Sequence, residues 1–318
     1  MSYNCHHDVL EVILYNSFES LDKASRRSIR SVGLSVRDLS DNLRQSMVTS
    51  SEYPIDLRHH RYTNLRELTV GKTNDNLDFL DKICRPKLIT PVHTGNATLI
   101  TDISALAACT KLDHLRLSRT RVVDISALAA CTHLRHLDLA ETRAVDISVL
   151  AACTNLRHLD LSHTRVSDIS ALAACTNLEH LNLQDTYVRD ISALAACTRL
   201  QHLDLADTRA VDISVLTACT DLRHLNLFLT GGVFDISALV ACTKLDHLDL
   251  CGTWVDDISA LAACTNLEYL DLADTCVDDI SALAACTKLE HLDLSDTKVI
   301  DISALAACTH LNVVGFDD

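Results

Sequence analysis

The chain has 318 residues and a formal net charge of −15, with 48% hydrophobic but only 4% aromatic residues. Few chain breakers are present (seven Gly and three Pro), which favours one elongated array over several ordinary domains. Residues 167–318 hold 7 Lys and Arg against 24 Asp and Glu. A surface this acidic repels phosphates and anionic lipids, which disfavours nucleic acid and membrane as partners and favours a basic or bipolar protein.

The compartment is predicted from what the sequence lacks. No apolar run approaches the roughly 20 residues that cross a bilayer. The first 14 residues contain His6, His7, Asp8 and Glu11, unlike the apolar core of a secretory signal. Fourteen Cys residues suit a reducing environment. We therefore expect a soluble, cytoplasmic protein.

Residues 1–55 carry two amphipathic patterns. Apolar residues recur at helical spacing over residues 9–21 and 29–43, which predicts a small helical N-terminal cap on the first coil of a repeat array. Residues 7–41 also resemble an F-box, a helical module that docks on a Skp-type adaptor, although its Leu-Pro opening and following Trp are absent. That resemblance implies an alternative function, the substrate receptor of a cullin-type ubiquitin ligase. Both interpretations stay open.

Residues 102–318 are built from near-identical units of 22 residues. An Asp-Ile-Ser signature begins the units at Asp102, Asp124, Asp146, Asp168, Asp190, Asp212, Asp235, Asp257, Asp279 and Asp301. The step from Asp212 to Asp235 is 23 residues, and the extra residue is predicted at Gly231-Gly232, as a local bulge. Residues 56–101 fit the same pattern as degenerate units. Regular repetition at this period predicts a solenoid.

Each unit predicts a strand and a helical turn. Leu159 and Leu161 alternate with polar residues, which indicates a short strand with its Leu side chains inward. The Ile-Ser-Ala-Leu-Ala-Ala-Cys stretch suits one turn of α or 3₁₀ helix, started by Asp or Ser as N-cap. One unit cannot bury its inward side chains alone, so consecutive units must stack.

The unit resembles leucine-rich repeats of the internalin type. The resemblance rests on L-x-x-L-x-L-x-x-T-x-V followed by D-I-S-x-L, over residues 102–318. It implies an α/β fold, a right-handed solenoid with a parallel sheet on the concave side and short α or 3₁₀ turns on the convex side. Thr stands where the family usually has Asn in the turn, and Cys opens the strand pattern. The implied function is a protein-interaction scaffold without enzymatic activity and without a cofactor.

One Cys recurs in every regular unit, at Cys109, Cys131, Cys153, Cys175, Cys197, Cys219, Cys242, Cys264, Cys286 and Cys308. Because its neighbours are Leu and Ala, we expect it to pack in the core as a small apolar residue rather than to bind metal or form disulfides. Cys251 and Cys276 fall outside this register and are expected in turns.

Two polar columns should project from the concave sheet, since they alternate with the inward Leu residues. The first is His114, His136, His158, His180, His202, His224, His247, Tyr269 and His291. The second is Arg116, Asp138, Asp160, Asn182, Asp204, Asn226, Asp249, Asp271 and Asp293. A metal site needs ligands that converge on one point, and a catalytic His-Asp pair needs a nucleophile, so neither fits a linear column. The columns could satisfy each other, and they could also bind a protein.

The predicted partner-binding residues on the concave face combine the columns with aromatic exceptions to the repeat. They are His136, Asp138, His158, Asp160, His180, Tyr187, His202, Asp204, Phe228, Asp249, Trp254, Tyr269, Asp271, His291 and Asp293. Aromatic residues are favoured because they dominate interface energetics. Carboxylates beside the imidazoles predict that the His residues titrate near neutral pH. No metal site is predicted.

Overall fold

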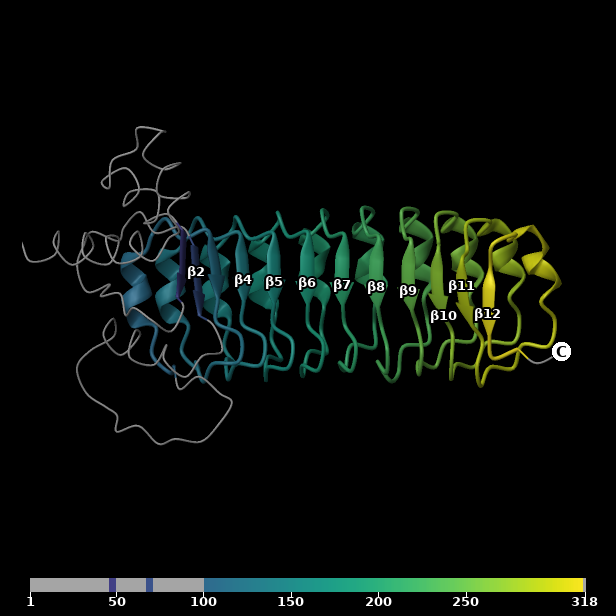
Figure 1. The fold of residues 1–318 in the computed structure, drawn as a ribbon, viewed down its shortest axis with the longest axis horizontal. Coiled ribbons are helices and arrows are strands. Elements are labelled where there is room, and N and C mark those ends of the chain that lie inside the picture. The colour runs from purple at the N-terminus through teal and green to yellow at the C-terminus, as the bar shows by residue number, and fades with distance from the viewer. Residues whose placement is uncertain (1–45, 50–66, 71–99, 317–318) are drawn as a thin grey trace, which may run out of the picture.

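The computed structural model describes residues 46–49, 67–70 and 100–316. In this part of the chain twelve parallel strands form one sheet in the order of the sequence, with 3₁₀ helices behind it (Figure 1). The strands are β1 (Ser46–Thr49), β2 (Glu67–Val70), β3 (His114–Arg116), β4 (His136–Asp138), β5 (His158–Asp160), β6 (His180–Asn182), β7 (His202–Asp204), β8 (His224–Asn226), β9 (His247–Asp249), β10 (Tyr269–Asp271), β11 (His291–Asp293) and β12 (Asn312–Val314).

A helix of five residues lies in each regular unit. These helices are η3 (Ser104–Ala108), η4 (Ser126–Ala130), η5 (Ser148–Ala152), η6 (Ser170–Ala174), η7 (Ser192–Ala196), η8 (Ser214–Ala218), η9 (Ser237–Ala241), η10 (Ser259–Ala263), η11 (Ser281–Ala285) and η12 (Ser303–Ala307). The sequence did not decide between α and 3₁₀ geometry. In the described units every helix is a 3₁₀ helix. The predicted leucine-rich repeat solenoid is confirmed.

The three-residue spacing of apolar residues explains the 3₁₀ geometry. Leu172 donates its backbone N–H to Ile169 at 2.9 Å, and Cys175 donates to Leu172 at 2.9 Å. Side chains three residues apart eclipse in a 3₁₀ helix, so Ile169, Leu172, Cys175 and Leu178 all face the core, where each is at most 1% exposed. An α-helix of 3.6 residues per turn would rotate this line away from the core.

The Asp of the Asp-Ile-Ser signature caps the helix from one position earlier than predicted. Asp168 Oδ1 accepts the backbone N–H of Ser170 at 2.8 Å, while the N-cap position itself is Ile169 and makes no side-chain cap. The predicted cap residue, Asp or Ser at N-cap, is therefore wrong in position. This bond lowers the pKa of Asp168, since it favours the carboxylate.

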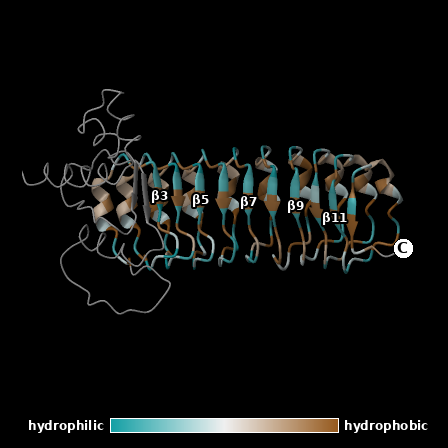
Figure 2. Ribbon diagram, in the orientation of Figure 1, coloured by the Kyte–Doolittle hydropathy of each residue, from teal (hydrophilic) through white to brown (hydrophobic). Residues whose placement is uncertain are grey.

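Strand register keeps identical residues side by side from coil to coil. His158 pairs with His180, and Leu159 pairs with Leu181, through the β5–β6 ladder. Leu159 is 2% exposed, whereas its neighbours in the strand are half-buried, as the alternation predicts. The same alternation of hydrophilic and hydrophobic segments recurs along the array (Figure 2).

The column of Cys residues is part of the core, as predicted. All ten are buried, and their thiols are free. Each later thiol also contacts the preceding coil, a feature not predicted: Cys175 Sγ lies 3.5 Å from the carbonyl oxygen of Leu150 and 3.8 Å from that of Cys153. Burial raises the pKa of Cys175 to about 12, so this thiol is a weak donor and a poor nucleophile.

The turn after each of β3–β10 uses a residue with a left-handed backbone and a buried Thr. Thr164 Oγ1 donates to the carbonyl oxygen of Leu161 at 2.6 Å, which satisfies the hydroxyl inside the core. The residue before this Thr has positive φ in eight described coils without Gly: Arg119, Glu141, His163, Asp185, Asp207, Leu229, Asp274 and Asp296. Because side chains of different kinds occupy this position, the shape of the turn depends on the backbone conformation and not on the side chain.

The extra residue of the 23-residue unit lies where the sequence predicts it. Thr230 and Val233 are both fully buried, and Gly231 and Gly232 bridge them where other units have a single residue. Gly232 has φ +104°, a conformation that favours glycine. Thr230 Oγ1 bonds the carbonyl oxygen of Leu205 in the previous coil instead of the carbonyl oxygen three residues before it.

The predicted cap over residues 1–55 falls outside the described residues except at β1. That strand pairs in parallel with β2, so the sheet begins within the range assigned to a helical cap. The degenerate repeats of residues 56–101 are described only at β2 and at residues 100–101, and β2 pairs with β3 as a repeat strand should. Within the described ranges every helix is too short or too polar to span a membrane.

Candidate functional site

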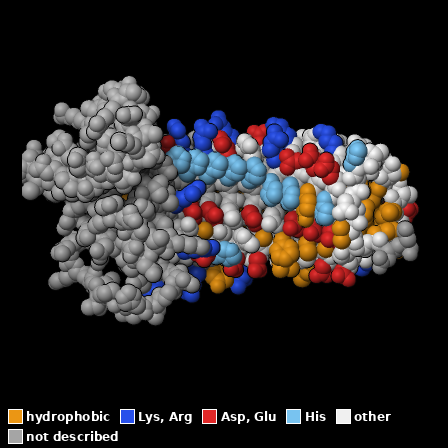
Figure 3. Space-filling view, viewed as in Figure 1, with side chains coloured by type: hydrophobic (Ala, Val, Ile, Leu, Met, Phe, Trp, Pro, Cys, Tyr) orange, Lys and Arg blue, Asp and Glu red, His pale blue; other side chains and the backbone are white. Residues whose placement is uncertain are grey.

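The first polar column forms a continuous stack of rings, called here the His column. It comprises His114, His136, His158, His180, His202, His224, His247, Tyr269 and His291. Ring centroids of neighbouring coils lie 4.0–5.7 Å apart, with interplanar angles of 7–27°. Parallel strands in register carry one ring per coil at about the strand spacing of 4.8 Å, so offset stacking follows directly from the register. Figure 3 shows the stripe crossing the sheet face.

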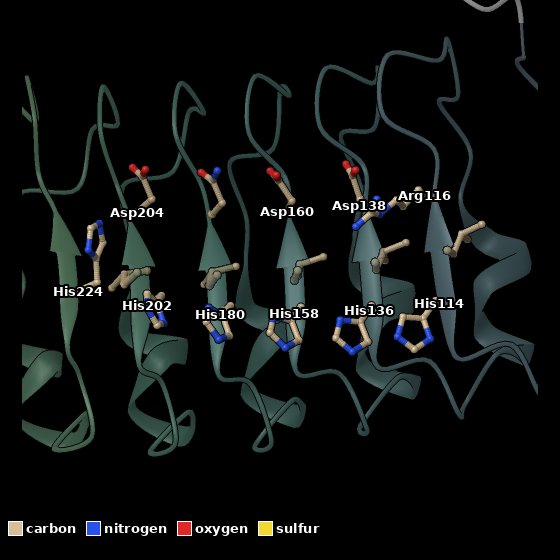
Figure 4. A pocket seen from close by; sticks show the side chains of 16 residues that line it. His114, Arg116, His136, Asp138, His158, Asp160, His180, His202, Asp204 and His224 are labelled. Atoms are coloured by element: carbon tan, nitrogen blue, oxygen red, sulfur yellow. The ribbon is translucent and has the colours of Figure 1, made fainter. Parts of the chain in front are cut away.

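The stack opens at one step. The centroids of His202 and His224 lie 5.7 Å apart, and the planes differ by 27°. Asn226 Nδ2 donates to Asp204 Oδ2 at 3.3 Å at this step, and the His224 ring lies on the Asp204 side of the row (Figure 4). His202 Nδ1 is buried and has no hydrogen-bond partner within the described structure. The column is thus divided next to the bulged unit.

Five imidazoles of the His column have a lowered pKa, so for them the prediction of titration near neutral pH is wrong in direction. Burial is the largest cause and the neighbouring rings are the next, since each disfavours the imidazolium. They lower the pKa of His180 and of His247 to about 4. The pKa is lowered for the same first reason at His136, His158 and His224. The carboxylates act on these rings too weakly to reverse the effect.

The second column, here the Asp/Asn column, caps the strand ends. Asp160 Oδ1 accepts the backbone N–H of Ser162, two residues on, at 2.9 Å. The same bond, at 2.8–3.1 Å, is made by Asp138, Asn182, Asp204, Asn226, Asp249, Asp271 and Asp293. Asp and Asn both supply the required acceptor, which explains their exchange along the column. The expectation that His and Asp satisfy each other is wrong, because the rings stack and the carboxylates bind backbone.

Partial burial makes several of these carboxylates less acidic. It raises the pKa of Asp249 to about 6, although the backbone N–H of Cys251 opposes the shift. Burial also raises the pKa of Asp138, Asp204 and Asp271. These carboxyl groups therefore take up a proton at a higher pH than an exposed carboxyl group does.

The two columns line a groove of about 500 Å³ along β3–β8 (Figure 4). Seven of the predicted residues line it: His136, Asp138, His158, Asp160, His180, His202 and Asp204. Tyr269 and His291 continue the stack, and Asp249, Asp271 and Asp293 continue the Asp/Asn column in register. His114, Arg116, Asn182 and His224 line it as well. The column register in the sequence already places these last residues there.

Three predicted residues lie elsewhere. Trp254 and Tyr187 each follow the buried Thr of the turn, and Phe228 follows a strand, so none of them lines the groove. Trp254 lines a separate groove of about 790 Å³ with Asp256, Asp257, Asp278 and Asp279. Tyr187 lies under the Arg209 guanidinium, whose Cζ is 5.1 Å from the ring centroid. Each of these three residues lies beyond the last residue of its strand, and their role in binding a partner stays a prediction.

The groove is lined by few residue types. Its lining comprises His, Leu, Arg, Asp and Asn, with no Ser, Thr, Cys or Lys that a His could activate. Stacked rings aim their nitrogens in parallel, whereas metal ligands must converge. The described residues contain no group of three or more His, Cys, Asp or Glu able to hold a metal ion.

Charge along the array is bipolar in sequence, but ion pairs offset part of it. Arg119 Nε lies 2.6 Å from Glu141 Oε1, and Arg157 pairs with Glu179 at 3.0 Å. These pairs join neighbouring coils and are exposed. Figure 3 shows hydrophobic and acidic side chains next to one another in the C-terminal half of the sheet face.

Family models recognise the repeats directly. Leucine Rich repeats (2 copies) matches residues 154–196 and 243–285, and Leucine Rich repeat matches residues 285–306. The chain therefore carries leucine-rich repeats. No curated protein matches the sequence.

Solved structures share the solenoid. An internalin (InlF) from Listeria monocytogenes is 25% identical, covers 93% of this chain and 96% of its own, and superposes with a TM-score of 0.65. The functional domain of InlJ from the same organism, which includes a cysteine ladder, is 19% identical over 84% of this chain and 66% of its own, with a TM-score of 0.58. The Arabidopsis receptor kinase HAESA, in complex with the peptide hormone IDA and the co-receptor SERK1, is 23% identical over 63% of this chain and 37% of its own, with a TM-score of 0.56. The F-box-like interpretation concerns residues 7–41, which lie outside the described residues and outside the matched repeats, and it stays a prediction.

Proposed function

We propose that this chain is a protein-interaction scaffold that binds an extended segment of a protein partner in the groove along β3–β8. The observation that carries the proposal is the groove itself, which crosses consecutive coils and presents stacked imidazoles beside carboxylates. An elongated groove suits an extended chain rather than a compact small molecule, for which pockets are closed and mostly apolar. The receptor kinase HAESA, which shares this fold, forms a complex with the peptide hormone IDA, and this supports the proposal.

The chemistry of the groove indicates what it recognises. The stacked imidazoles cover one another's faces and present their edges to the groove, where ring nitrogens donate or accept hydrogen bonds. Arg116 at one end and Asp138 and Asp160 beyond it give the groove opposite charges along its length. A bipolar or basic partner segment complements this arrangement. We also propose that this partner is bound in the cytoplasm.

Site-specific photo-crosslinking tests it. Benzoylphenylalanine is placed at His158 or His202 in the groove and, as matched controls in the same coils, at the exposed residues Ala151 or Ala195 on the 3₁₀ helices. Irradiation in the native cell should give one adduct from both groove positions and none from the controls. Adducts from the 3₁₀ positions alone would place the partner on the other face and overturn the proposal.

A further inference from the structure

The side of the solenoid that carries the residues just after each turn Thr, called here the flank, changes in composition after the bulged unit. In four earlier coils the residue after the turn Thr is Arg: Arg121, Arg143, Arg165 and Arg209. In the coils of β9 and β10 this position holds Trp254 and Cys276. Two positions later, where several coils have Val, the same two coils have Asp256 and Asp278. The scaffold does not require either change, because the residue between the two positions, Val255 or Val277, is fully buried, as the corresponding Val is in other coils.

Exposed apolar side chains are found in the coils where this composition changes. Trp254 is 66% exposed, Phe234 is 60% exposed and Val211 is 45% exposed. They occupy successive coils: Trp254 donates its backbone N–H to Val233 at 2.9 Å, and a Cβ on Gly232 would lie 3.3 Å from Val211 Cγ2. Large apolar side chains gathered on a surface mark interaction sites in soluble proteins.

The groove beside Trp254 has an acidic wall. Asp256 and Asp257 in one coil lie in register with Asp278 and Asp279 in the next, and Lys298 is the basic residue in its lining. All four carboxylates are exposed. The backbone N–H of Ser259 lowers the pKa of Asp257 and keeps it ionised. Carboxylates spaced by about 5 Å lie within one Debye length and add their potentials.

We propose that this flank is a second docking surface, which binds a basic peptide segment of a partner protein. An apolar side chain of that segment packs against Trp254 and Phe234, and its Lys or Arg side chains lie among Asp256, Asp257, Asp278 and Asp279. The charge complementarity selects a basic occupant over an acidic one, and the Trp ring attracts a cation over its face. The groove along β3–β8 shares no lining residue with this surface.

Trp254 is the single Trp of the chain, so its fluorescence reports on this surface alone. The full chain is titrated with three acetylated, amidated heptapeptides, which alternate Lys with Leu, Glu with Leu, and Lys with Ser. We expect saturable quenching or a spectral shift with the Lys-Leu peptide, at least about tenfold weaker binding of the Lys-Ser peptide, and none of the Glu-Leu peptide. Equal binding of the Glu-Leu peptide, or no response to the Lys-Leu peptide at millimolar concentration, overturns the proposal.

Two variants of equal charge separate this surface from general attraction to an acidic protein. Asp256→Val with Asp278→Val installs the residue that several other coils carry. It should weaken the binding of the Lys-Leu peptide by about tenfold or more. Asp274→Asn with Asp296→Asn removes the same charge from left-handed turn positions, where Asn is well tolerated, and should leave binding within about twofold. Equal loss in both variants would show that only net charge matters. Photo-adducts at His158 are unaffected by either pair, which keeps the two proposals independent.

Discussion

The sheet face and the flank around Trp254 follow opposite rules within one array. On the sheet face nearly every coil repeats the same ring and the same Asp or Asn, and both are used structurally, since the rings stack at 4.0–5.7 Å and the carboxylates or amides accept a backbone N–H. On the flank, Arg, Tyr, Trp, Cys and Lys exchange at one position, and the residue that follows is always a Val or Ala that packs in the core. Packing explains the uniform positions, so we expect the variable positions to carry any specificity for a partner.

The largest contrast should appear in stability. Leu194→Ala removes a fully buried side chain of η7 and should lower the free energy of unfolding by about 2–5 kcal/mol. Trp254→Arg, on the flank, should change it by less than about 0.5 kcal/mol, because Trp254 is 66% exposed and Arg occupies the same position in four other coils. Urea unfolding followed by circular dichroism measures both. A large loss from Trp254→Arg would mean that the flank is part of the scaffold.

A smaller effect is expected where the flank and the turn meet. Gly252 has φ +70°, and a Cβ there would lie 2.6 Å from Leu229 Cδ2. Gly252→Ala should therefore cost about 1–2 kcal/mol, from the left-handed backbone and the displacement of Leu229. Adding Leu229→Ala to this variant should restore the part of the free energy of unfolding that is lost through the clash with Leu229.

Gly231→Ala is the matched control for Gly252→Ala. Nothing lies within 4 Å of its Cβ position and its φ is not left-handed, so the substitution should be neutral within about 0.5 kcal/mol. Equal losses at both glycines would show that the bulge, rather than the contact with Leu229, limits stability.

Repetition made the fold predictable from the sequence. Strict spacing placed the strands, the buried Cys and the bulge, because one unit observed many times defines one inward pattern. The 3₁₀ geometry was also available in the three-residue spacing of Ile169, Leu172 and Cys175, although the prediction left it open. Local periodicity therefore contained nearly all of the scaffold.

The site was harder to predict because its physics depends on neighbours in space. The sequence shows His two residues from Asp in several strands, and the prediction coupled them, whereas the strand register puts one His against the next His. The position of Trp254 was missed for a related reason. Periodicity identifies an exception to the repeat, but only the coil shape decides whether that exception faces the sheet groove or the flank.

The smallest expected effect is a pH dependence that tests the His column directly. The pKa of His180 and of His247 falls to about 4 in the folded chain, below the ordinary value of 6.5, so the unfolded chain binds these protons more readily. Their contribution to stability is complete above pH 6.5 and is lost as the pH falls toward 4. Raised carboxyl pKa values, such as about 6 at Asp249, act in the opposite direction over the same range.

Replacing two His rings by Tyr separates the contribution of the imidazoles to the pH dependence of stability from that of the carboxylates. His180→Tyr with His247→Tyr keeps a stacked ring, as Tyr269 already does 4.1 Å from His247, and removes two titrating groups. Between pH 7 and pH 5 the melting temperature of the variant should fall less than that of the parent chain, by a few degrees at most, because the rings are partly exposed and solvent screens them. His133→Tyr, at an exposed position outside the column, should not alter the profile. Parallel melting curves for the parent chain and the double Tyr variant would show that stacking, rather than the charge state of the imidazoles, is all that the column contributes to the sheet face.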